Sequence, residues 1–308
     1  MPIAQGLRRV VESQQFSREL IDELIGRAEE MRDNPHRAAG RLQGRVLAAL
    51  FYEPSTRTRL SFEAAMLRLG GRTMGTDNAH EFSSAAKGET LEDTIRVVSG
   101  YADVIVLRHD EEGAARRAAA VSDVPLINAG DGRGQHPTQA LLDVFTIKQE
   151  VGRLDGVRVA MVGDLANGRT VRSLAYLLGK YLGVRIWFVS PPQVAMRDDI
   201  KEHLDERGVE WHETEDLDSL LPQVDVVYQT RIQKERFPDT AAYEAVRGCY
   251  RVGPAELARM RDDAIVMHPL PRLDEVDSAI DGDRRAAYFR QARNGLHIRM
   301  ALLDMVLS

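Results

Sequence analysis

The sequence has almost no cysteine and no long apolar stretch. Cys249 is the single cysteine among 308 residues, so no disulfide can form within one chain and a zinc site built from cysteines is excluded. No segment reaches the ~18 consecutive apolar residues that a membrane-spanning helix needs. Residues 1–17 contain no unbroken apolar run of the kind found in a secretory signal peptide. We therefore expect a cytoplasmic protein without a membrane partner.

An excess of positive charge is also lacking. The formal net charge is −6, which gives no general reason to expect nucleic acid or an anionic membrane surface as a partner. A site for an anion would have to be built locally, from gathered arginine and lysine side chains. No metal-binding spacing is visible, because His109 and His136 lack nearby partners in sequence and no H-x-x-x-H pattern occurs. We expect no metal ion and no nucleic acid.

Short apolar runs rich in valine, isoleucine and leucine alternate with helical patterns along the chain. The length of 308 residues suits two domains of ~150 residues each. Strands separated by helices imply right-handed βαβ units, so we predict an α/β fold of two doubly wound domains, each with a mainly parallel sheet covered by helices. The predicted strands are Val46–Tyr52, Val104–Leu107, Leu126–Asn128, Val157–Val162, Val184–Val189, Val224–Gln229 and Ala264–His268. The predicted helices include Leu60–Leu69, Leu91–Tyr101, Thr138–Gln149, Val171–Tyr181, Ile200–Arg207 and Arg285–Leu307.

A domain boundary is expected near Glu150–Asp155, where a helix ends before a new strand begins. In open parallel sheets, ligands bind beyond the carboxyl ends of the strands. Segments that follow a strand and open a helix are therefore the most informative places in this sequence.

The segment Glu53–Arg59 lies at such a junction, directly after the first predicted strand. Its hydroxyl side chains can cap free backbone N–H groups, and the same N–H groups with the positive end of the helix dipole form a phosphate site. Arg57 can bind a phosphate through two parallel hydrogen bonds. A plain capping motif with solvated arginines is the alternative. The alternation of hydroxyls and guanidiniums at this turn favours an anion site.

A second junction is Gly130–Gln139. Its glycines allow the backbone to approach a ligand closely. His136 lies near the helix entrance, where it could donate a hydrogen bond to a carbonyl oxygen and stabilise the charge that develops there. Taken alone, such a histidine is more often a cap or a turn residue. Its place at the end of a strand in the same sheet as Glu53–Arg59 favours a functional role.

The segment Gly163–Thr170 opens the second half and fits the spacing of a P-loop, except that Arg169 stands where lysine is expected. A nucleotide-binding module is therefore a rival hypothesis. The missing lysine counts against it, and so does the lack of a strand that ends in the aspartate expected for magnesium. The planar guanidinium of Arg169 suits a carboxylate better.

Two later segments follow strands. In Tyr228–Arg236, Arg231 and Gln233 alternate and could face one side of an extended segment, with Lys234 turned away. A charged surface loop is the alternative. In His268–Arg272, two prolines remove N–H groups and leave carbonyl oxygens that could accept hydrogen bonds from an NH₂ group. A rigid turn without further function is the alternative.

Two basic segments are ordinary when taken individually. The loop Ser83–Glu89 is rich in small residues and carries Lys87. Arg108 and His109 end the predicted strand Val104–Leu107. These two segments indicate a functional role only in combination with the other segments.

The combination of segments resembles a known family. Ser55–Arg59, His136–Gln139 and His268–Arg272 are similar to the signature segments of the carbamoyltransferases. The resemblance runs nearly end to end, and several motifs in the same order make chance agreement implausible. The segments that narrow it to the catalytic chains of aspartate carbamoyltransferases are those around Lys87, Gly163–Thr170 and Arg231–Gln233.

The resemblance implies transfer of a carbamoyl group from carbamoyl phosphate to the α-amino group of L-aspartate, a step of pyrimidine biosynthesis, without a cofactor. It implies a carbamoyl-phosphate-binding domain of residues 1–151 plus 286–308 and an aspartate-binding domain of residues 152–285, joined by interdomain helices. It also implies a homotrimer with shared active sites, into which Ser83 and Lys87 reach from a neighbouring chain. Whether a regulatory chain or a dihydroorotase joins the trimer is not visible in the sequence.

The resemblance also assigns roles by position. The phosphate would be held by Ser55, Thr56, Arg57, Thr58 and Arg108. The carbonyl oxygen would be surrounded by Thr58, Arg108 and His136, and the NH₂ group would bind Gln139 and the carbonyl oxygens of Leu270 and Pro271. The aspartate carboxylates would bind Arg169, Arg231, Gln233 and Lys87. Catalysis is assigned to His136, Arg108, Thr58, Arg57 and Lys87. On domain closure Glu53 would pair with Arg169 and Arg236.

Ornithine carbamoyltransferases are the alternative within the family. The ammonium group of ornithine would fit poorly beside Arg231 and Lys234. The Cys-Leu-Pro segment of those enzymes is here Pro269-Leu270-Pro271, without the cysteine. Pro54 departs from the small residue expected at that position and affects no assigned contact. Aspartate is therefore the expected acceptor.

Overall fold

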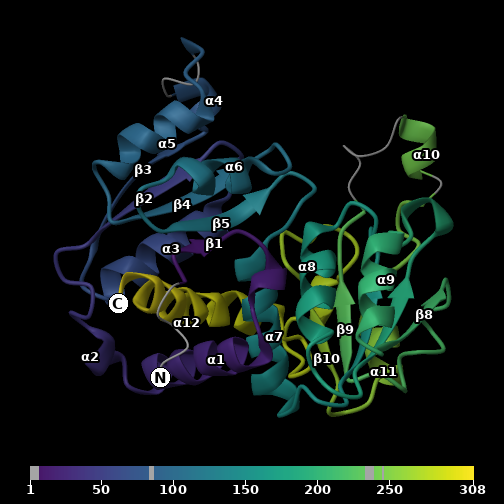
Figure 1. Cartoon of the computed structure of the whole chain (residues 1–308). Coiled ribbons are helices and arrows are strands. Elements are labelled where there is room, and N and C mark those ends of the chain that lie inside the picture. Colours follow the sequence, from purple (N-terminus) through teal and green to yellow (C-terminus); the bar gives the residue numbers. More distant parts are fainter. Residues whose placement is uncertain (1–6, 83–86, 233–238, 245) are drawn as a thin grey trace. The chain divides into compact units, whose positions relative to one another are not determined.

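The computed structural model of the chain describes residues 7–82, 87–232, 239–244 and 246–308 (Figure 1). The chain divides into two compact units. Unit 1 comprises Met1–Leu142 and Arg293–Ser308, and unit 2 comprises Asp143–Ala292. Each unit has its own five-stranded sheet. Two helices, α7 (Pro137–Val151) and α12 (Tyr288–Leu307), continue from one unit into the other.

Unit 1 contains a sheet with the strand order β1-β5-β4-β2-β3, in which all pairs are parallel. Every residue of β4 and β5 is buried, as expected for a parallel sheet that is covered on both faces. On one face, Leu50 and Leu107 share a hydrophobic cluster with Ile95 of α5 and Ala118 of α6. The strands are β1 (Arg9–Val10), β2 (Val46–Phe51), β3 (Arg72–Asp77), β4 (Val104–His109) and β5 (Leu126–Asp131). The helices are η1 (Ser13–Gln15), α1 (Arg18–Asp33), α2 (Pro35–Ala38), α3 (Thr56–Arg68), α4 (Ala79–Phe82), α5 (Leu91–Ser99) and α6 (Ala114–Val121).

Unit 2 contains a sheet with the strand order β10-β9-β6-β7-β8, again with all pairs parallel. Val162 and Val227 of this sheet lie in one hydrophobic cluster with Leu257 of α11 and Tyr288 of α12. The strands are β6 (Arg158–Val162), β7 (Arg185–Val189), β8 (Glu210–Thr214), β9 (Val226–Gln229) and β10 (Ile265–Met267). The helices are α8 (Arg169–Leu178), η3 (Pro192–Val194), α9 (Asp198–Glu206), α10 (Thr240–Glu244), α11 (Pro254–Arg259) and η5 (Ser278–Ile280).

The seven predicted strands are all present, and the prediction of two parallel sheets covered by helices is confirmed. Three strands were not predicted: β1, β3 and β8. Each of them lies at the edge of its sheet. β1 has only two residues, and most residues of β3 and β8 are exposed, so these strands carry no apolar run that could reveal them.

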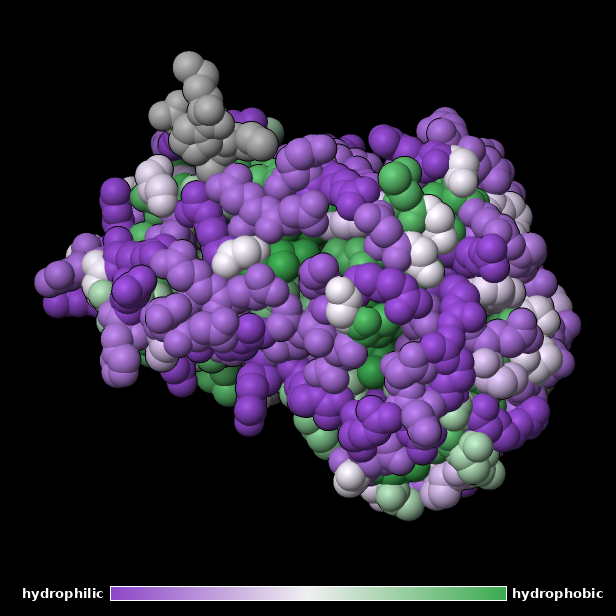
Figure 2. Space-filling view, turned by 90° about the horizontal axis from the view of Figure 1, so that it is seen from below, coloured by the Kyte–Doolittle hydropathy of each residue, from purple (hydrophilic) through white to green (hydrophobic). Residues whose placement is uncertain are grey.

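The surface is mainly hydrophilic, with small and separate apolar patches on the face shown in Figure 2. In the described part of the chain, no helix combines the length and the apolar character that crossing a membrane requires. The large apolar side chains that are exposed are Leu60, Leu67, Met74, Val97, Tyr101, Leu182, Leu273 and Phe289.

Candidate active site

The strand order reverses beside one central strand in each unit. In unit 1, β3 lies on one side of β2 and β4 on the other; in unit 2, β7 lies on one side of β6 and β9 on the other. Open parallel sheets bind ligands at the carboxyl ends of strands where the order reverses. Ser55–Arg59 follows β2 and Arg108 lies near the end of β4, whereas Arg169 follows β6 and Arg231 follows β9. These four predicted site segments therefore lie at the reversal point of each sheet, whereas His136 follows β5 and Leu270 follows β10.

The start of α3 has the features of an anion site. Ser55 is the N-cap residue in an extended conformation, and its side chain makes no capping hydrogen bond. The backbone N–H groups of the first turn therefore need another acceptor, and a helix start of this kind favours an anion. Thr58 is buried in this turn.

The two arginines of this turn differ in their partners. Arg59 makes ion pairs with Glu63 at 2.8 Å and with Asp77 at 2.7 Å. Arg57 has no carboxylate partner among the residues that the structure describes, and desolvation lowers the pKa of its guanidinium. A guanidinium nevertheless stays charged at neutral pH. Arg57 is therefore a cation for which the described residues supply no counterion.

Arg108 is buried near the end of β4, and its contacts include Glu53 and Ala129 of unit 1. One Nη lies 3.0 Å from a carboxylate oxygen of Glu53, and the other donates to the carbonyl oxygen of Ala129 at 3.2 Å. Glu53 thus contacts Arg108 in this structure. The guanidinium has five donors in a fixed plane, so these contacts define its orientation at the edge of the sheet.

The loop between β5 and α7 is held by Asn128 and Asp131. Asn128 accepts the N–H of Gly130 at 2.7 Å and donates to Asp131 at 3.2 Å. Asp131 also accepts the N–H groups of Gln135 at 2.9 Å and Gly113 at 3.1 Å. Sequence reasoning assigned no role to Asn128 or Asp131, although a polar side chain inside an apolar strand was a visible signal.

His136 lies at the end of this loop and is buried. Its carbonyl oxygen accepts the N–H groups of Gln139 at 3.0 Å and Ala140 at 3.2 Å, so the residue caps the start of α7. Its Nδ1 lies 3.3 Å from the hydroxyl oxygen of Thr138. If this hydroxyl donates to Nδ1, the proton of a neutral ring resides on Nε2, which can then donate. The structural and the functional interpretations of His136 are thus compatible.

In unit 2, the loop after β6 packs against the chain that follows β9. Thr230 donates from its N–H and its hydroxyl to the carbonyl oxygen of Val162, at 2.8 and 2.9 Å. Gly163 has a φ of +114°, and a Cβ atom at this position would lie 2.4 Å from the carbonyl oxygen of Thr230. Only glycine fits there. This contact fixes the start of the loop that leads to Arg169.

The same loop argues against a phosphate-binding P-loop. Asp164 is fully buried, and its carboxylate accepts the backbone N–H of Asn167 at 3.0 Å. In a P-loop, such backbone N–H groups bind phosphate oxygens. A buried carboxylate inside the loop takes that place and would repel a phosphate. Arg169 is the first residue of α8 and is partly exposed.

The turn after β10 has an unusual backbone. The peptide bond between Leu270 and Pro271 is cis, and Leu270 has a φ of +53°. Arg272 is engaged away from this backbone: it pairs with Asp281 at 2.6 Å and its guanidinium lies 5.0 Å from the ring centre of Tyr288. The carbonyl oxygens, rather than the arginine, are therefore the groups of this turn that suit a ligand.

Several predicted site residues are not described. Ser83, Gln233 and Arg236 lie outside the described residues, as does Lys234. Lys87 is described and is exposed. The structure places Ser55–Arg59, Arg108 and His136 at or after the ends of strands in the sheet of unit 1, and it places Arg169, Arg231 and Leu270 after neighbouring strands of unit 2.

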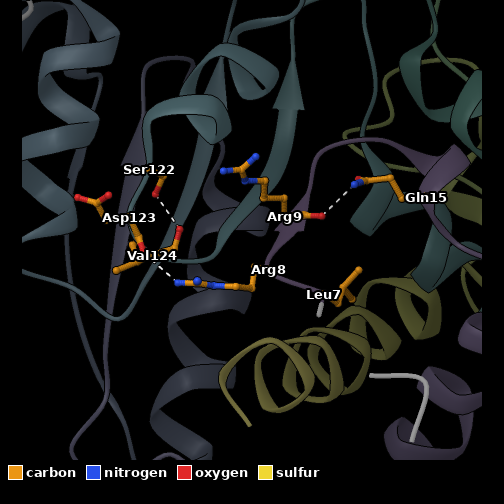
Figure 3. A pocket seen from close by; sticks show the side chains of 7 residues that line it. All are labelled: Leu7, Arg8, Arg9, Gln15, Ser122, Asp123 and Val124. Carbon is orange, nitrogen blue, oxygen red and sulfur yellow. Dashed lines mark hydrogen bonds between the residues drawn. The ribbon is translucent and has the colours of Figure 1, made fainter. Parts of the chain in front are cut away.

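A pocket of about 570 Å³ lies elsewhere in unit 1 (Figure 3). Arg8 donates to the carbonyl oxygen of Asp123 at 2.9 Å across this pocket, and Gln15 donates to the carbonyl oxygen of Arg9 at 3.0 Å. Arg9 pairs with the first residue of β5, so the pocket lies at the amino ends of these parallel strands. It is at the edge opposite the predicted site and contains none of its residues. The residues that line it are Leu7, Arg8, Arg9, Gln15, Ser122, Asp123 and Val124.

Two family models match the chain in succession. Residues 8–149 match the carbamoyl-phosphate-binding domain of the aspartate/ornithine carbamoyltransferases, and residues 155–306 match their aspartate/ornithine-binding domain. The chloroplastic aspartate carbamoyltransferase of Oryza sativa subsp. japonica is 62% identical, over 99% of this chain and 87% of the relative. The aspartate carbamoyltransferase catalytic subunit of Methanocella arvoryzae is 50% identical, over 98% of this chain and 97% of the relative.

Solved structures show the same similarity. Aspartate transcarbamoylase from Trypanosoma cruzi, in complex with carbamoyl phosphate and aspartate, superposes with a TM-score of 0.94 at 42% identity, covering 100% of this chain and 99% of that one. The catalytic subunit of the Methanocaldococcus jannaschii enzyme superposes with a TM-score of 0.90 at 49% identity, covering 97% and 98%.

The comparisons correct one expectation. The sequence led us to expect a cytoplasmic protein, but the relatives from Oryza sativa, Pisum sativum and Arabidopsis thaliana, which are 60–62% identical, are chloroplastic proteins. The predicted location is therefore wrong. The lack of long apolar stretches does not distinguish the two locations, because a plastid location does not require such stretches.

Proposed function

The chain belongs to the aspartate/ornithine carbamoyltransferase family, and we propose that it transfers the carbamoyl group of carbamoyl phosphate to the α-amino group of L-aspartate. The products are N-carbamoyl-L-aspartate and phosphate, and the reaction is an early step of pyrimidine biosynthesis. The observation that carries this conclusion is that both domain models match in order, together with full-length relatives named for aspartate. The ornithine alternative has no comparable support from these relatives.

For the phosphate group we propose the start of α3 and Arg108. The uncapped first turn of α3 offers backbone N–H groups, and Arg57 offers a charge without a described counterion. Arg108 adds a second guanidinium from the neighbouring strand β4. Together they would offset the dianionic charge of the phosphate. The residues of this group are Ser55, Thr56, Arg57, Thr58 and Arg108.

For the carbonyl oxygen we propose Thr58, Arg108 and His136. These groups would donate hydrogen bonds to the oxygen where negative charge develops, which is the main electrostatic contribution in acyl-transfer reactions. The hydroxyl of Thr138 near Nδ1 of His136 supports a ring that donates from Nε2. The NH₂ group would donate to Gln139 and to the carbonyl oxygens of Leu270 and Pro271.

For aspartate we propose the basic residues of unit 2 with Lys87. Arg169 and Arg231 follow the neighbouring strands β6 and β9, so both guanidiniums come from one edge of the sheet. Planar guanidiniums suit two carboxylates. Gln233, which lies outside the described residues, completes this group. We also propose that residues 1–151 plus 286–308 act as the carbamoyl-phosphate domain and residues 152–285 as the aspartate domain.

In the mechanism, the uncharged α-amino group attacks the carbonyl carbon and a C–N bond forms. The tetrahedral oxyanion then collapses, the C–O bond to the phosphate breaks, and the amine proton passes to the departing phosphate. The donor is already activated, so positioning is the principal task of the protein. Orienting two bound reactants can contribute up to about 7–11 kcal/mol. Preorganised donors at the oxyanion supply a further part.

We propose a homotrimer in which Ser83 and Lys87 of one chain complete the site of a neighbour. Lys87 is exposed, as such a role requires. Unit 1 also exposes Leu60 and Leu67, which lie seven positions apart on α3 and therefore on one face of the helix. Sedimentation equilibrium would test this state, and a monomer that is fully active would contradict it. A regulatory chain or a dihydroorotase would be detected by co-purification with the trimer.

The function is tested by one parallel assay. Purified protein is given carbamoyl phosphate with aspartate, with ornithine, or with neither, and ureido product and phosphate are measured. We expect equal amounts of ureido product and phosphate in the sample with aspartate, and no ureido product in the other two samples. Ureido product in the ornithine sample but not in the aspartate sample would reject the acceptor assignment. A separate sample receives ATP without carbamoyl phosphate. Hydrolysis of this ATP would instead support the nucleotide-binding alternative.

A further inference from the structure

The turn after β10 is held by a buried pair of side chains that the mechanism above does not use. We propose that His268 and Glu275 are positioning residues, which fix the backbone of Leu270 so that its carbonyl oxygen meets the NH₂ group of carbamoyl phosphate. This inference rests on the proposed function, which places the carbonyl oxygens of Leu270 and Pro271 at that group. Both side chains act through the backbone and neither is a catalytic residue.

His268 is only 2% exposed, and both of its ring nitrogens make hydrogen bonds within the turn. Its Nδ1 accepts the backbone N–H of Leu270 at 2.8 Å, and its Nε2 lies 2.8 Å from a carboxylate oxygen of Glu275. A ring nitrogen that accepts carries no proton, so the neutral ring has its proton on Nε2 and donates it to Glu275. The two contacts lie on different sides of the ring and fix its orientation.

Leu270 needs this support because of its backbone conformation. Its φ of +53° lies in the left-handed region, where the Cβ atom of a residue other than glycine is crowded. A residue persists there only when its surroundings determine the conformation. The hydrogen bond from its N–H to His268 opposes relaxation of φ. Because rotation about φ of Leu270 also moves its carbonyl group, the same bond restricts where the carbonyl oxygen points.

Glu275 closes the turn from the other end. Its carboxylate accepts the N–H of Leu273, at 3.2 Å to each oxygen, as well as the bond from His268. Burial alone would raise the pKa of Glu275, but the hydrogen bonds from His268 and from backbone N–H groups outweigh it and leave the pKa below the ordinary value. Glu275 is therefore an ionised acceptor that joins His268 to Leu273 across the turn.

A buried chain of hydrogen bonds connects this turn to three other elements of unit 2. The backbone N–H of His268 donates to the side-chain oxygen of Gln291 in α12 at 2.9 Å. The amide of Gln291 donates to Asp143 of α7 at 2.7 Å, and the hydroxyl of Tyr228 in β9 donates to the other oxygen of Asp143 at 2.7 Å. These side chains are almost fully buried, so the turn is fixed to the end of the strand that precedes Arg231. This arrangement ties the proposed NH₂ acceptors to the proposed aspartate site.

Two substitutions of His268 separate its two hydrogen bonds. In His268→Asn, the side-chain oxygen can take the place of Nδ1 and accept the N–H of Leu270. In His268→Gln, the terminal amide can take the place of Nε2 and donate to Glu275, but the acceptor for Leu270 is lost. A displacement of the order of 1 Å at a reacting group can cost about 100-fold in rate. We expect kcat for carbamoyl transfer to fall about 100-fold in His268→Gln and only about tenfold in His268→Asn.

The readouts separate positioning from general damage. We expect the KM for aspartate and the inhibition constant of inorganic phosphate to stay within about twofold of wild type in both variants, because Arg231 and the start of α3 are unchanged. Thermal melting of each variant is measured alongside, to check that the variant folds. Equal losses of kcat in the two variants, or a parallel change in the phosphate inhibition constant, would overturn the proposal. A wild-type chain that fails to carbamoylate aspartate would reject the proposed function itself, before any variant is compared.

A second pair decides the matter if the His268 variants do not fold. Glu275→Gln keeps an oxygen that accepts from Nε2 of His268, whereas Glu275→Ala removes it. We expect Glu275→Ala to lower kcat about tenfold more than Glu275→Gln does. Equal kcat values in this pair would also overturn the proposal.

Discussion

The loop after β5 in unit 1 and the turn after β10 in unit 2 both contain residues with a positive φ, but the residue types differ. In unit 1, the loop before His136 uses glycine where the backbone has a positive φ, at Gly130 and Gly132. In unit 2, the turn after β10 places Leu270 at a φ of +53°. Glycine adopts such a conformation without a steric penalty, whereas leucine does not. The loop after β5 thus uses glycine at its positive φ angles, whereas the turn after β10 holds a leucine there through the hydrogen bond from its N–H to His268.

The two loops nevertheless share one device. Each is closed by a buried carboxylate that accepts backbone N–H groups: Asp131 in unit 1 and Glu275 in unit 2. Each carboxylate also binds a polar side chain, which is Asn128 within β5 in one case and His268 directly after β10 in the other. Buried polar groups of this kind are tolerated because their hydrogen bonds are satisfied. They make one conformation of the loop more stable than the alternative conformations. The common lesson is that the loops are rigid supports for their carbonyl and imidazole groups.

The largest effect is expected at the carbonyl site proposed for unit 1. We expect His136→Ala to lower kcat about 100- to 1,000-fold, equivalent to about 2.7–4 kcal/mol, because a donor to the oxyanion is lost. The dissociation constant of carbamoyl phosphate should change by less than about tenfold, since the phosphate contacts remain. Steady-state kinetics measure the first quantity and equilibrium binding the second. A variant with an altered KM and an unchanged kcat would show that His136 only caps α7.

In unit 2 we expect a substitution at the proposed aspartate site to change the KM for aspartate more than kcat. We expect Arg231→Ala to raise the KM for aspartate about 10- to 100-fold, which corresponds to about 1.4–2.8 kcal/mol, with a smaller change in kcat. The reason is the loss of a charge-assisted contact to a carboxylate of the acceptor. Saturation curves for aspartate at fixed carbamoyl phosphate give both constants. Arg207→Ala, at the end of α9, serves as a control for the loss of one positive charge in the same unit. An unchanged aspartate KM in Arg231→Ala would contradict the division of labour between the units.

The contrast between the loops themselves can be tested by exchanging their residue types. A Cβ atom at Gly132 would lie 2.5 Å from the carbonyl oxygen of Asp110, and the φ of Gly132 is +50°. We expect Gly132→Ala to lower the free energy of unfolding by about 1–3 kcal/mol. Leu270→Gly removes the crowded Cβ but frees the unfolded chain, so its change should stay within about 1 kcal/mol. Urea unfolding of both variants measures the difference, and a larger loss in Leu270→Gly would reverse the comparison.

The smallest effect concerns pH and the segment of unit 2 before α12. Hydrogen bonds from the side chain and the N–H of Arg285 hold the pKa of Asp283 at about 2. Because this pKa is below the unfolded value of about 3.9, the pair stabilises the fold above that value and loses its contribution as the pH falls towards about 2. We expect Asp283→Asn to be less stable than wild type by under about 1 kcal/mol at neutral pH, since the pair is partly exposed.

The pH dependence of that variant provides its own control. The stability difference between Asp283→Asn and wild type should shrink between about pH 6 and about pH 3, as the contribution of the carboxylate is lost. Unfolding curves at both values measure it. A constant difference would mean that Arg285 does not determine the ionisation of Asp283.

Much of the fold was accessible from sequence because the central strands are mainly apolar. Val104–Leu107 and Val224–Gln229 stand out for this reason, and both proved to be interior strands. The edge strands β3 and β8 were missed, since one face and one edge of such strands meet water and their sequences are polar. Glu275 was missed as well. An acidic residue in a loop is usually solvated, and only its burial beside His268 distinguishes it.

The chemical groups at the junctions between strands and helices, such as Arg57 after β2 and Arg169 after β6, could be identified without coordinates. These features are local, because strand and helix patterns and the capping residues between them are written within a few neighbouring positions. The pairing of β2 with β4 and of β6 with β9 became visible only in the folded chain. Strand order depends on contacts between residues far apart in the chain, and it is this order that brings Arg108 to the start of α3 and Arg231 to the same sheet edge as Arg169.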